Sequence, residues 1–309
     1  MKLSRVIGNT WVAEGMELIP FYRLEGGRCI LLDTGLPAER EELESSLLEG
    51  GLVPAGVLCS HAHVDHCGNN GYFQEKYHIP VALTAPEAGM CQNLLTLKCY
   101  FLNFSPDRSA QRSQGMLHTP DVLVPLRDGP FDFAGARFRI VCTPGHSPGH
   151  IAVITPDNVC YAADALLSHE MLGAKLPYEL SHRGAIESRE KLRGLNCDAY
   201  ILAHRGVCPP VHFQELIDAN QQLIQERLEE ILEIIDHPME FSRISASVCT
   251  HYQLFTHKPE RALAFERNIR FFVEYLVDAG LVEMECRRGA LYYKPARRGP
   301  GPVEFPGLT

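Results

Sequence analysis

The sequence predicts an α/β fold with two β-sheets flanked by helices, followed by a smaller, mainly helical C-terminal domain. Short apolar segments with strand character recur along most of the chain and alternate with segments of helical period. A long amphipathic helix follows them, and after it the pattern is helix, helix and hairpin. A chain of 309 residues can hold one large and one small domain. We therefore expect a large domain over 1–207, a smaller unit over 208–295 and a tail over 296–309.

The first half of the large domain is predicted to consist of strands and two helices. Strands are expected over 3–7, 10–13, 19–24, 29–32, 57–60 and 80–84. Gly26-Gly27 provides a hairpin turn between two of these strands. A helix over 37–48 begins with a proline and ends before Gly50-Gly51, and a shorter helix covers 71–77.

Residues 85–120 follow no single pattern. A helical period is present over 87–97, whereas 103–119 are polar and irregular. A segment of this length without regular structure is either a lid over a substrate site or an insertion without such a role. Both interpretations stay open at this point.

The second half of the large domain returns to strands, and the C-terminal unit is mainly helical. Strands are expected over 122–125, 137–143, 151–155, 158–162 and 199–203, with a helix over 185–192. A long helix over 211–235 is then stopped by Pro238. Helices over 242–251 and 262–279 and a hairpin of strands 282–286 and 290–294 follow in winged-helix order. The Arg-, Gly- and Pro-rich tail is expected to be disordered.

The composition is that of a soluble globular protein and restricts the class of partner. Hydrophobic residues make up 45% and charged residues 22% of the chain. The net charge of -9 argues against a general nucleic-acid or anionic-membrane surface. No apolar run has the length of a signal segment or a membrane span. The 11 cysteines are scattered and odd in number, with no Cys-x-x-Cys pair, so we expect a reducing, cytoplasmic location.

One segment, His61-Ala62-His63-Val64-Asp65-His66, predicts metal chemistry. It follows the apolar run at 57–60, where the strand must end. In an extended segment alternate side chains point the same way, so His61 and His63 can share one ion. Asp65 and His66 fall where the chain turns and are aimed at a neighbouring position. Imidazole nitrogen and carboxylate oxygen suit zinc and related metals such as iron or manganese.

Three further candidate ligands stand at the ends of predicted strands. His146 lies in a Gly- and Pro-rich loop, Asp164 ends the apolar run at 160–163, and His204 follows the last strand. Any one of them alone would more often be structural, and Asp164 could simply cap a helix. Four separate strands, however, each supply a ligand at the end where loops gather. One site can therefore collect all of them.

These motifs resemble the metallo-β-lactamase fold superfamily. The resemblance rests on Asp33 in Leu-Leu-Asp-Thr-Gly, the His-x-His-x-Asp-His-x-Gly segment that starts at His61, and His146, Asp164 and His204, in the family's order. It covers roughly residues 1 to 207 and implies a four-layer αββα sandwich. The winged-helix-like unit behind it resembles the branch that contains β-lactamase-like protein 2. Members of that branch have been linked to thioester-like hydrolysis and to RNA cleavage.

The resemblance also implies a role for each ligand. His61, His63 and His146 would hold a first metal, and Asp65, His66 and His204 a second, with Asp164 bridging the two. Asp33 would support a ligand from behind, because a metal-bound imidazole needs a partner on its other nitrogen. The expected cofactors are two divalent ions, most readily Zn²⁺, with Fe or Mn as alternatives. Asp65 and Asp164 are expected to be catalytic, orienting a bridging hydroxide and moving its proton.

Departures from individual branches narrow the expected activity. True β-lactamases generally lack an aspartate at the position of Asp164, and flavodiiron proteins carry a glutamate where this chain has His63. We therefore expect a dinuclear hydrolase that cleaves a small ester or thioester, similar to glyoxalase II or the lactonases. A small-molecule substrate, no membrane association and a possible homodimer complete this expectation. Ser147, Cys67 and His150 are interpreted as structural, and His169 as a pocket residue.

Two alternatives remain. A phosphodiesterase or endoribonuclease of the same fold would use the C-terminal unit, but residues 237–309 hold ten Lys/Arg against eight Asp/Glu, too even for a strong phosphate-binding surface. A metal-containing sensor could bind DNA through the helix at 262–279, which carries Arg267 and Arg270 just after Arg261. Four residues between 166 and 183 could contact an anionic substrate: Lys175, Tyr178, His182 and Arg183.

Overall fold

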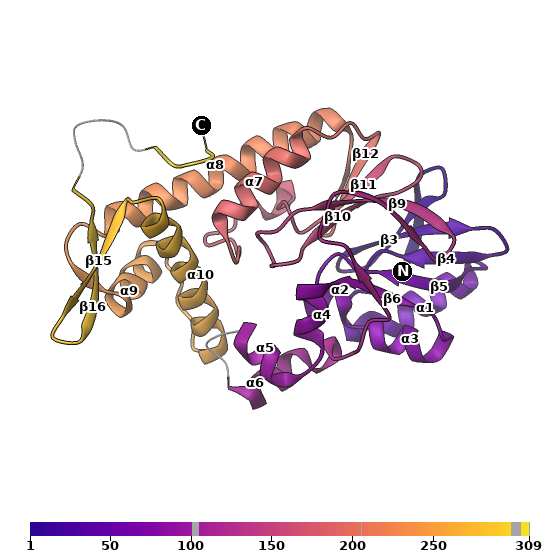
Figure 1. The fold of residues 1–309 in the computed structure, drawn as a ribbon, viewed down its shortest axis with the longest axis horizontal. Coiled ribbons are helices and arrows are strands. Elements are labelled where there is room, and N and C mark those ends of the chain that lie inside the picture. Colours follow the sequence, from indigo (N-terminus) through magenta and orange to yellow (C-terminus); the bar gives the residue numbers. More distant parts are fainter. Residues whose placement is uncertain (101–104, 205, 298–303, 309) are drawn as a thin grey trace.

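The chain folds into a sandwich of two β-sheets with helices on both outer faces and a C-terminal unit beside it (Figure 1). A computed structural model describes residues 1–100, 105–204, 206–297 and 304–308. The predicted α/β sandwich is confirmed in its layers.

The first sheet has seven strands, paired in chain order from β1 to β7. Their bounds are β1 Lys2–Ile7, β2 Thr10–Glu14, β3 Leu18–Leu24, β4 Arg28–Leu31, β5 Val53–Leu58, β6 Val81–Thr84 and β7 Val122–Val124. The strands from β1 to β4 pair antiparallel, and those from β4 to β7 pair parallel. Gly26 and Gly27 form the predicted hairpin turn, with φ angles of 71° and 69° that suit glycine.

The second sheet has six strands in the order β13-β12-β11-β10-β9-β8. Their bounds are β8 Gly129–Phe133, β9 Ala136–Cys142, β10 Ile151–Ile154, β11 Val159–Ala163, β12 Ala199–Leu202 and β13 Gly206–Cys208. β8 and β13 were not predicted from the sequence. Both are edge strands that begin with glycine, and proline lies within β8 and directly after β13; these residues weaken the strand signal and are tolerated at an edge.

Three hydrophobic cores join the four layers. On the outer face of the first sheet lie α1 (Arg40–Glu49, preceded by a 3-10 turn at Pro37–Glu39), α3 (Asn70–Tyr77) and α4 (Ala85–Cys91). Between the sheets, side chains of both pack together, among them Leu58 and Ile151. On the outer face of the second sheet lie α7 (His182–Arg193) and α8 (Pro210–Ile234). There the rings of Tyr200 and Phe213 stack with centroids 3.7 Å apart.

The structure corrects two expectations for residues 85–120. The single helix predicted over 87–97 is two helices, α4 and α5 (Leu94–Tyr100). The segment predicted as irregular contains α6 (Pro106–Ser113) and a 3-10 turn at Gln114–Met116, although residues 103–104 lie outside the described part of the chain. Ser105 caps α6 by accepting a hydrogen bond from the backbone of Arg108, and proline occupies the first turn. The polar composition of α6 concealed this start signal.

The C-terminal unit packs around the second half of α8. It comprises β14 (Met239–Glu240), α9 (Phe241–His251), α10 (Pro259–Asp278), β15 (Val282–Arg287) and β16 (Ala290–Pro295), and its sheet has the order β14-β16-β15. Its core includes Leu228 of α8, Phe272 of α10 and Ile186 of α7, so the unit is joined to the sandwich by buried contacts. The helices and the hairpin occur in the predicted order. The likeness to winged-helix proteins stays a prediction.

Part of the tail is packed, which corrects the expectation of disorder for residues 304–308. Phe305 is 2% exposed and belongs to the core of the C-terminal unit. The Tyr275 hydroxyl donates a hydrogen bond to the Pro306 carbonyl at 2.8 Å. Residues 298–303 and 309 lie outside the described residues.

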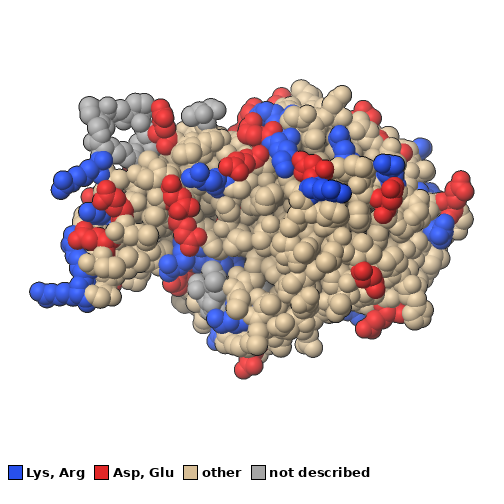
Figure 2. Space-filling view, viewed as in Figure 1, with Lys and Arg blue, Asp and Glu red and all other residues tan. Residues whose placement is uncertain are grey.

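Within residues 1–100, 105–204, 206–297 and 304–308, no helix combines the length and apolarity needed to cross a bilayer. Figure 2 shows acidic and basic side chains interspersed on the displayed face, without a continuous basic surface.

Candidate metal centre

Strand direction brings the candidate ligands to one edge of the sandwich. β9 and β11 both pair antiparallel to β10, and β11 pairs parallel to β12. The strands β9, β11 and β12 therefore run in the same direction and end at the same edge. The loops after these strands carry His146, Asp164 and His204. In the first sheet, the parallel strands β4 and β5 lead to Asp33 and His61. The fold therefore gathers residues that are far apart in sequence.

The histidine-rich segment turns from extended backbone into a short helix. His63 has φ -99° and ψ 154° and precedes α2 (Val64–Cys67), which carries Asp65 and His66 in a single turn. Gly68 ends this turn in a position where a Cβ atom would lie 2.3 Å from a backbone oxygen. The glycine is therefore required for the sharp turn that aims the two ends of the segment at neighbouring positions.

The first group of ligand atoms consists of three imidazole nitrogens and one carboxylate oxygen. His63 Nδ1 lies 3.0 Å from His61 Nε2 and 2.9 Å from His146 Nε2. Asp164 Oδ2 lies 3.3 Å from His146 Nε2 and 3.9 Å from His61 Nε2. Burial lowers the pKa of His61 and His63 well below the usual value and that of His146 to about 4. Neutral imidazoles with converging lone pairs are the form that binds a metal.

The second group shares Asp164 with the first. Asp164 Oδ2 lies 3.3 Å from both His66 Nε2 and His204 Nε2, and His204 Nε2 lies 3.8 Å from Asp65 Oδ2. One further residue, Glu17, was not predicted from the sequence and joins this group. One ligand atom from each of Glu17, Asp65, His66 and His204 lies within 4.8 Å of the others. All seven predicted ligands are thus brought together.

Buried atoms without partners show that the residues present fit metal ions. His66 Nε2, Asp164 Oδ1 and Glu17 Oε2 are buried and accept or donate no hydrogen bond among the described residues. Leaving such an atom unpaired costs about 1–3 kcal/mol, and more when it is charged. A divalent cation among these nitrogen and oxygen atoms would satisfy them together, and the donor set is one that zinc accepts.

Asp33 holds His66 from the side opposite the ligand group. Its Oδ2 accepts hydrogen bonds from His66 Nδ1 at 2.8 Å and from the Tyr161 hydroxyl at 2.6 Å, while Oδ1 accepts from the Ser60 backbone at 2.6 Å. Burial disfavours the ionised form of Asp33, but the hydrogen bonds from His66, Ser60 and Tyr161 outweigh it and keep its pKa below the usual value. The arrangement directs His66 Nε2 at the ligand group, as a supporting residue must.

A second buried carboxylate, Glu87, was not found from the sequence. It accepts hydrogen bonds of 2.7 Å from the Ala62 backbone, the Ser147 hydroxyl and the Gly149 backbone. Burial raises the pKa of Glu87 to about 7. The side chain therefore ties the loop of His61 to the loop of His146. In the sequence, Glu87 stands in the first turn of a helix, where an acidic residue is common because it interacts favourably with the helix dipole, so the position gives no sign of this role.

The comparison with known protein families agrees with this geometry. The sequence profile of the metallo-beta-lactamase superfamily matches residues 14–204, which contain every predicted ligand. The chain belongs to the metallo-beta-lactamase superfamily.

Individual relatives of this metallo-beta-lactamase superfamily protein are distant. The chain is 28% identical to the probable metallo-hydrolase YqgX of Bacillus subtilis (strain 168), over 49% of this chain and 64% of the relative. It is 26% identical to the hydroxyacylglutathione hydrolase of Rhizobium meliloti (strain 1021), over 64% of this chain and 66% of the relative. The chain thus spans about two thirds of the length of these relatives.

Solved structures match over nearly the whole chain. A metallo-beta-lactamase family protein from Thermus thermophilus is 25% identical, with a TM-score of 0.67 over 91% of this chain and 94% of that chain. A beta-lactamase domain protein from Burkholderia ambifaria is 17% identical, with a TM-score of 0.71 over 95% and 93% of the two chains. The second likeness concerns the fold alone. These matches confirm the predicted sandwich architecture, and the family profile confirms the predicted superfamily.

The residues interpreted as structural surround the ligands in this superfamily protein. His150 Nδ1 lies 2.8 Å from the Thr143 hydroxyl, and its Nε2 accepts a hydrogen bond from the Asp164 backbone at 3.3 Å, so His150 supports the loop. Cys67 is buried in the core of the first sheet. His169, in the 3-10 turn His169–Met171, is exposed and does not line the cavity, so its predicted role as a pocket residue is wrong.

A cavity of about 500 Å³ opens above the ligands. Besides the ligands, it is lined by side chains from the loop at 166–179 and by Arg112 of α6 and Arg267 of α10. The Arg267 guanidinium lies 4.4 Å from the centre of the Tyr178 ring, and the Tyr178 hydroxyl lies 2.8 Å from that of Tyr100. The Tyr100 hydroxyl in turn contacts His63 Nε2 at 2.5 Å. The C-terminal unit therefore contributes directly to the cavity wall.

Of the four residues expected to contact an anionic substrate, only Tyr178 lines this cavity. Lys175 donates a hydrogen bond to the Tyr252 carbonyl at 2.8 Å, and His182 is buried against Phe272. Arg183 is exposed on α7, outside the cavity wall. The expectation that Lys175 or Arg183 faces the cavity is therefore wrong. The segment around Leu176 is held against α10 by a hydrogen bond from Asn268, and Arg267 of that helix lines the cavity instead.

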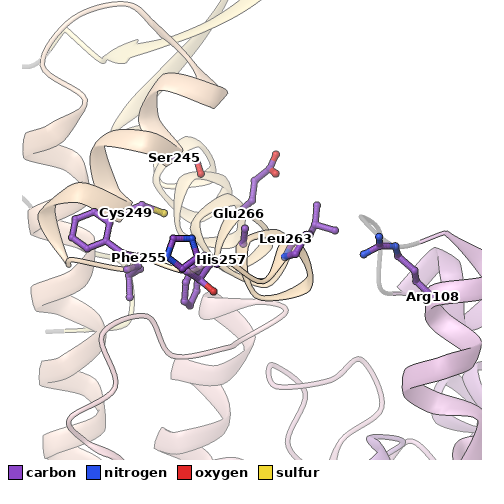
Figure 3. Close-up of a pocket in the computed structure, with 12 residues that line it drawn as sticks. Arg108, Ser245, Cys249, Phe255, His257, Leu263 and Glu266 are labelled. Atoms are coloured by element: carbon purple, nitrogen blue, oxygen red, sulfur yellow. The ribbon is translucent and has the colours of Figure 1, made fainter.

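A second cavity, of about 740 Å³, lies away from the ligands between α6, α9 and α10. Figure 3 shows Arg108 facing it from α6, opposite Cys249, Phe255 and Leu263 of the C-terminal unit. None of the described metal-ligand clusters falls among its lining residues.

Proposed function

We propose that this protein is a dinuclear metal-dependent hydrolase that cleaves a small carboxylic ester or thioester. The observation that carries the proposal is the pair of ligand groups that share Asp164 at the base of a cavity of about 500 Å³. Relatives named metallo-hydrolase and hydroxyacylglutathione hydrolase support the reaction class and favour a thioester. The cavity has the volume of a small-molecule site.

The proposed division of ligands follows the two groups. His61, His63 and His146 would hold one ion, while Asp65, His66 and His204 would hold the other, with Asp164 between them. Two divalent ions bound there, most readily Zn²⁺, would lower the pKa of a water molecule and polarise the carbonyl oxygen of the substrate. The nitrogen-rich first group favours zinc, although iron or manganese suits the same ligand types.

Asp65 is the proposed proton acceptor of the chain. Its carboxylate lines the cavity, beside His204. Burial, together with the charges of Asp164 and Glu17, raises the pKa of Asp65 above its usual value. A carboxylate with a raised pKa holds a proton more readily at neutral pH, as a general base requires. Asp164 would orient the same water molecule through its position between the groups.

The charge of Arg267 in the cavity wall favours a substrate that carries a negative charge. Its guanidinium lies over Tyr178 in the cavity wall, and its Nε is buried without a hydrogen-bond partner within the described parts of the chain. Burial lowers the pKa of Arg267, yet a guanidinium remains charged at neutral pH. A carboxylate or phosphate on the substrate, distant from the cleaved bond, would satisfy this cation.

Hydrolysis assays on the metal-loaded chain test the proposal. Zinc- or manganese-loaded protein should hydrolyse S-lactoylglutathione, acidic acyl thioesters, aryl esters or lactones, and His146→Ala should abolish this turnover. Absence of turnover with every ester, thioester and lactone, at full metal occupancy, would contradict it.

The nucleic-acid alternatives gain no support from the arginines of α10. The Arg270 guanidinium lies 3.8 Å from the centre of the Phe241 ring, and that of Arg261 lies 5.7 Å from the Phe265 ring. Arg267 faces the metal cavity. Arg270 and Arg267 therefore already have neighbours within the protein, and of these three arginines Arg261 is the exposed one. The homodimer and the cytoplasmic location stay predictions from the sequence.

A further inference from the structure

Glu17 is a buried carboxylate beside the second ligand group. It lies in the turn between β2 and β3 and is 8% exposed. The backbone explains its position, because the Leu18 amide donates a hydrogen bond to the Ala203 carbonyl at 2.8 Å. Leu18 and Ala203 directly follow Glu17 and directly precede His204, respectively. This bond between the two sheets therefore places the Glu17 and His204 side chains next to each other.

The two carboxylate oxygens of Glu17 face different ligands. Oε1 lies 3.3 Å from His204 Nδ1, the ring nitrogen that points away from Asp164. Oε2 lies 3.9 Å from His66 Nε2. Both Oε2 and His66 Nε2 are buried without hydrogen-bond partners among the residues described. An acidic side chain retained only for solubility would be exposed to water, whereas this one directs an unsatisfied oxygen at the ligand group.

We propose that Glu17 is a functional part of the second metal site. Its Oε1 accepts a hydrogen bond from His204 Nδ1–H and so presents His204 Nε2 to the ion. Its Oε2 supplies a third carboxylate, beside Asp65 and Asp164, to bind the ion directly or through a water molecule. The inference rests on the proposed two-ion site, and it concerns metal binding rather than the substrate.

The added carboxylate makes the two metal positions chemically different. The first group combines three imidazoles with one carboxylate, whereas the second combines His66 and His204 with three carboxylates. Oxygen-rich sites suit harder ions such as Mn²⁺, and imidazole-rich sites suit Zn²⁺. The ligand of the Glu17 site is therefore a divalent cation of the Mn²⁺ to Zn²⁺ range, and Zn²⁺ should fill the imidazole-rich first position before it.

Metal titration of the full chain tests this proposal without an activity assay. Metal-free wild type, Glu17→Gln, Glu17→Ala and the control Glu14→Gln are titrated with Zn²⁺ and separately with Mn²⁺, and bound metal is measured after equilibrium dialysis. Co²⁺ absorption spectra report the environment of each position. Glu14 lies at the end of β2 near Glu17, with its side chain 39% exposed, and provides the matched control. Circular dichroism confirms that each variant is folded.

We expect the second equivalent of metal to bind about 10-fold more weakly to Glu17→Gln and about 100-fold more weakly to Glu17→Ala. The first equivalent and the Glu14→Gln variant should match wild type. Wild-type affinity in Glu17→Gln would overturn the proposal, because glutamine can still accept the hydrogen bond from His204 while lacking the charge. A wild-type chain that binds a single ion would overturn it as well.

These outcomes are distinct from those of the hydrolysis assay. A chain that binds two ions with the expected dependence on Glu17, but hydrolyses nothing, refutes the proposed function and leaves the metal site intact. If the chain hydrolyses thioesters but the affinity of its second ion does not change when Glu17 is substituted, only this inference is refuted.

Discussion

His66 Nδ1 donates a hydrogen bond to Asp33 Oδ2 over 2.8 Å, and this contact fixes which nitrogen of the ring faces the ligand group. Asp33→Asn keeps the shape of the side chain but removes its charge. We expect the second metal ion to bind about 10- to 100-fold more weakly, as for other partners behind metal-ligating histidines. Competition with a chelator measures this affinity. Asp33 has φ 74°, a conformation that asparagine also adopts, so the variant should fold.

Tyr161→Phe provides the control for that prediction. It removes one of the hydrogen bonds to Asp33 and leaves the charge in place. Its effect on metal affinity should be clearly smaller than that of Asp33→Asn. Equal effects of the two variants would mean that general loosening of the core, rather than the partner of His66, governs metal affinity.

The bond network of Glu87 predicts a loss of stability on substitution. Glu87→Gln places an amide N–H₂ group against the backbone or hydroxyl donors that the carboxylate now accepts from. One buried donor is left without an acceptor, which costs about 1–3 kcal/mol. Urea unfolding of the metal-free protein measures the change. The exposed Glu49→Gln should alter the free energy of unfolding by less than about 0.5 kcal/mol; a similar loss in both variants would refute the role of the network.

Arg267 predicts a substrate preference that its removal should abolish. Arg267→Met keeps apolar contact with Tyr178 but removes the charge. The KM for an acidic thioester should rise about 10-fold with kcat nearly unchanged, because uniform binding is lost. The KM for a neutral ester should stay the same. Arg270→Met is the control, since Arg270 lies over Phe241 away from the cavity. Equal changes for acidic and neutral substrates would argue against an anion contact.

His182 predicts a stability that falls in acid. Its ring is 2% exposed and packs on Phe272 with centroids 3.9 Å apart. Burial, reinforced by the charge of Arg189, lowers its pKa from 6.5 to about 3. Between these pH values the unfolded chain binds a proton that the folded chain does not. The stabilising contribution of the neutral ring is therefore complete above pH 6.5 and is lost as the pH falls towards 3.

His182→Phe should remove this dependence. Between pH 8 and pH 5, the stability of the variant relative to wild type should improve by about 2 kcal/mol, measured by urea unfolding of the metal-free protein. The remaining buried histidines titrate in both proteins and cancel in the difference. A difference that does not change with pH would show that His182 is already protonated or solvated in the folded state.

The sequence was sufficient for residues whose signal is local. His61 and His63 are two residues apart at a strand end, and His146 lies in a glycine-rich loop, so their chemistry was visible without the fold. Glu17 was not predictable, because its partner His204 becomes a neighbour only through the bond between Leu18 and Ala203. Arg267 was interpreted on its own helix, whereas its role depends on how α10 packs against the sandwich. Sequence patterns thus reveal ligands that stand at the ends of predicted strands, whereas residues that only tertiary contacts bring to the site are missed.

Secondary structure was likewise predictable where the signal is local and was missed where it depends on neighbouring elements. Strong apolar strands such as β10 and β11 were predicted within one residue of their observed bounds. The polar helix α6 was missed because it contains almost no apolar residues, although Ser105-Pro106 is a helix-start signal. The edge strands β8 and β13 were missed because only pairing with a neighbouring strand defines them.

A combined titration of metal content and thioester hydrolysis tests whether the protein is a hydrolase that depends on two bound metal ions. Metal-free protein is supplied with increasing Zn²⁺, and bound metal and turnover of an acidic acyl thioester are measured on the same samples. We predict two ions per chain and turnover that reaches its maximum only when the second position fills. His146→Ala, which removes a ligand of the first position, should lower the metal content and abolish turnover. Full turnover with one ion or none bound, or no turnover with both positions filled, would contradict it.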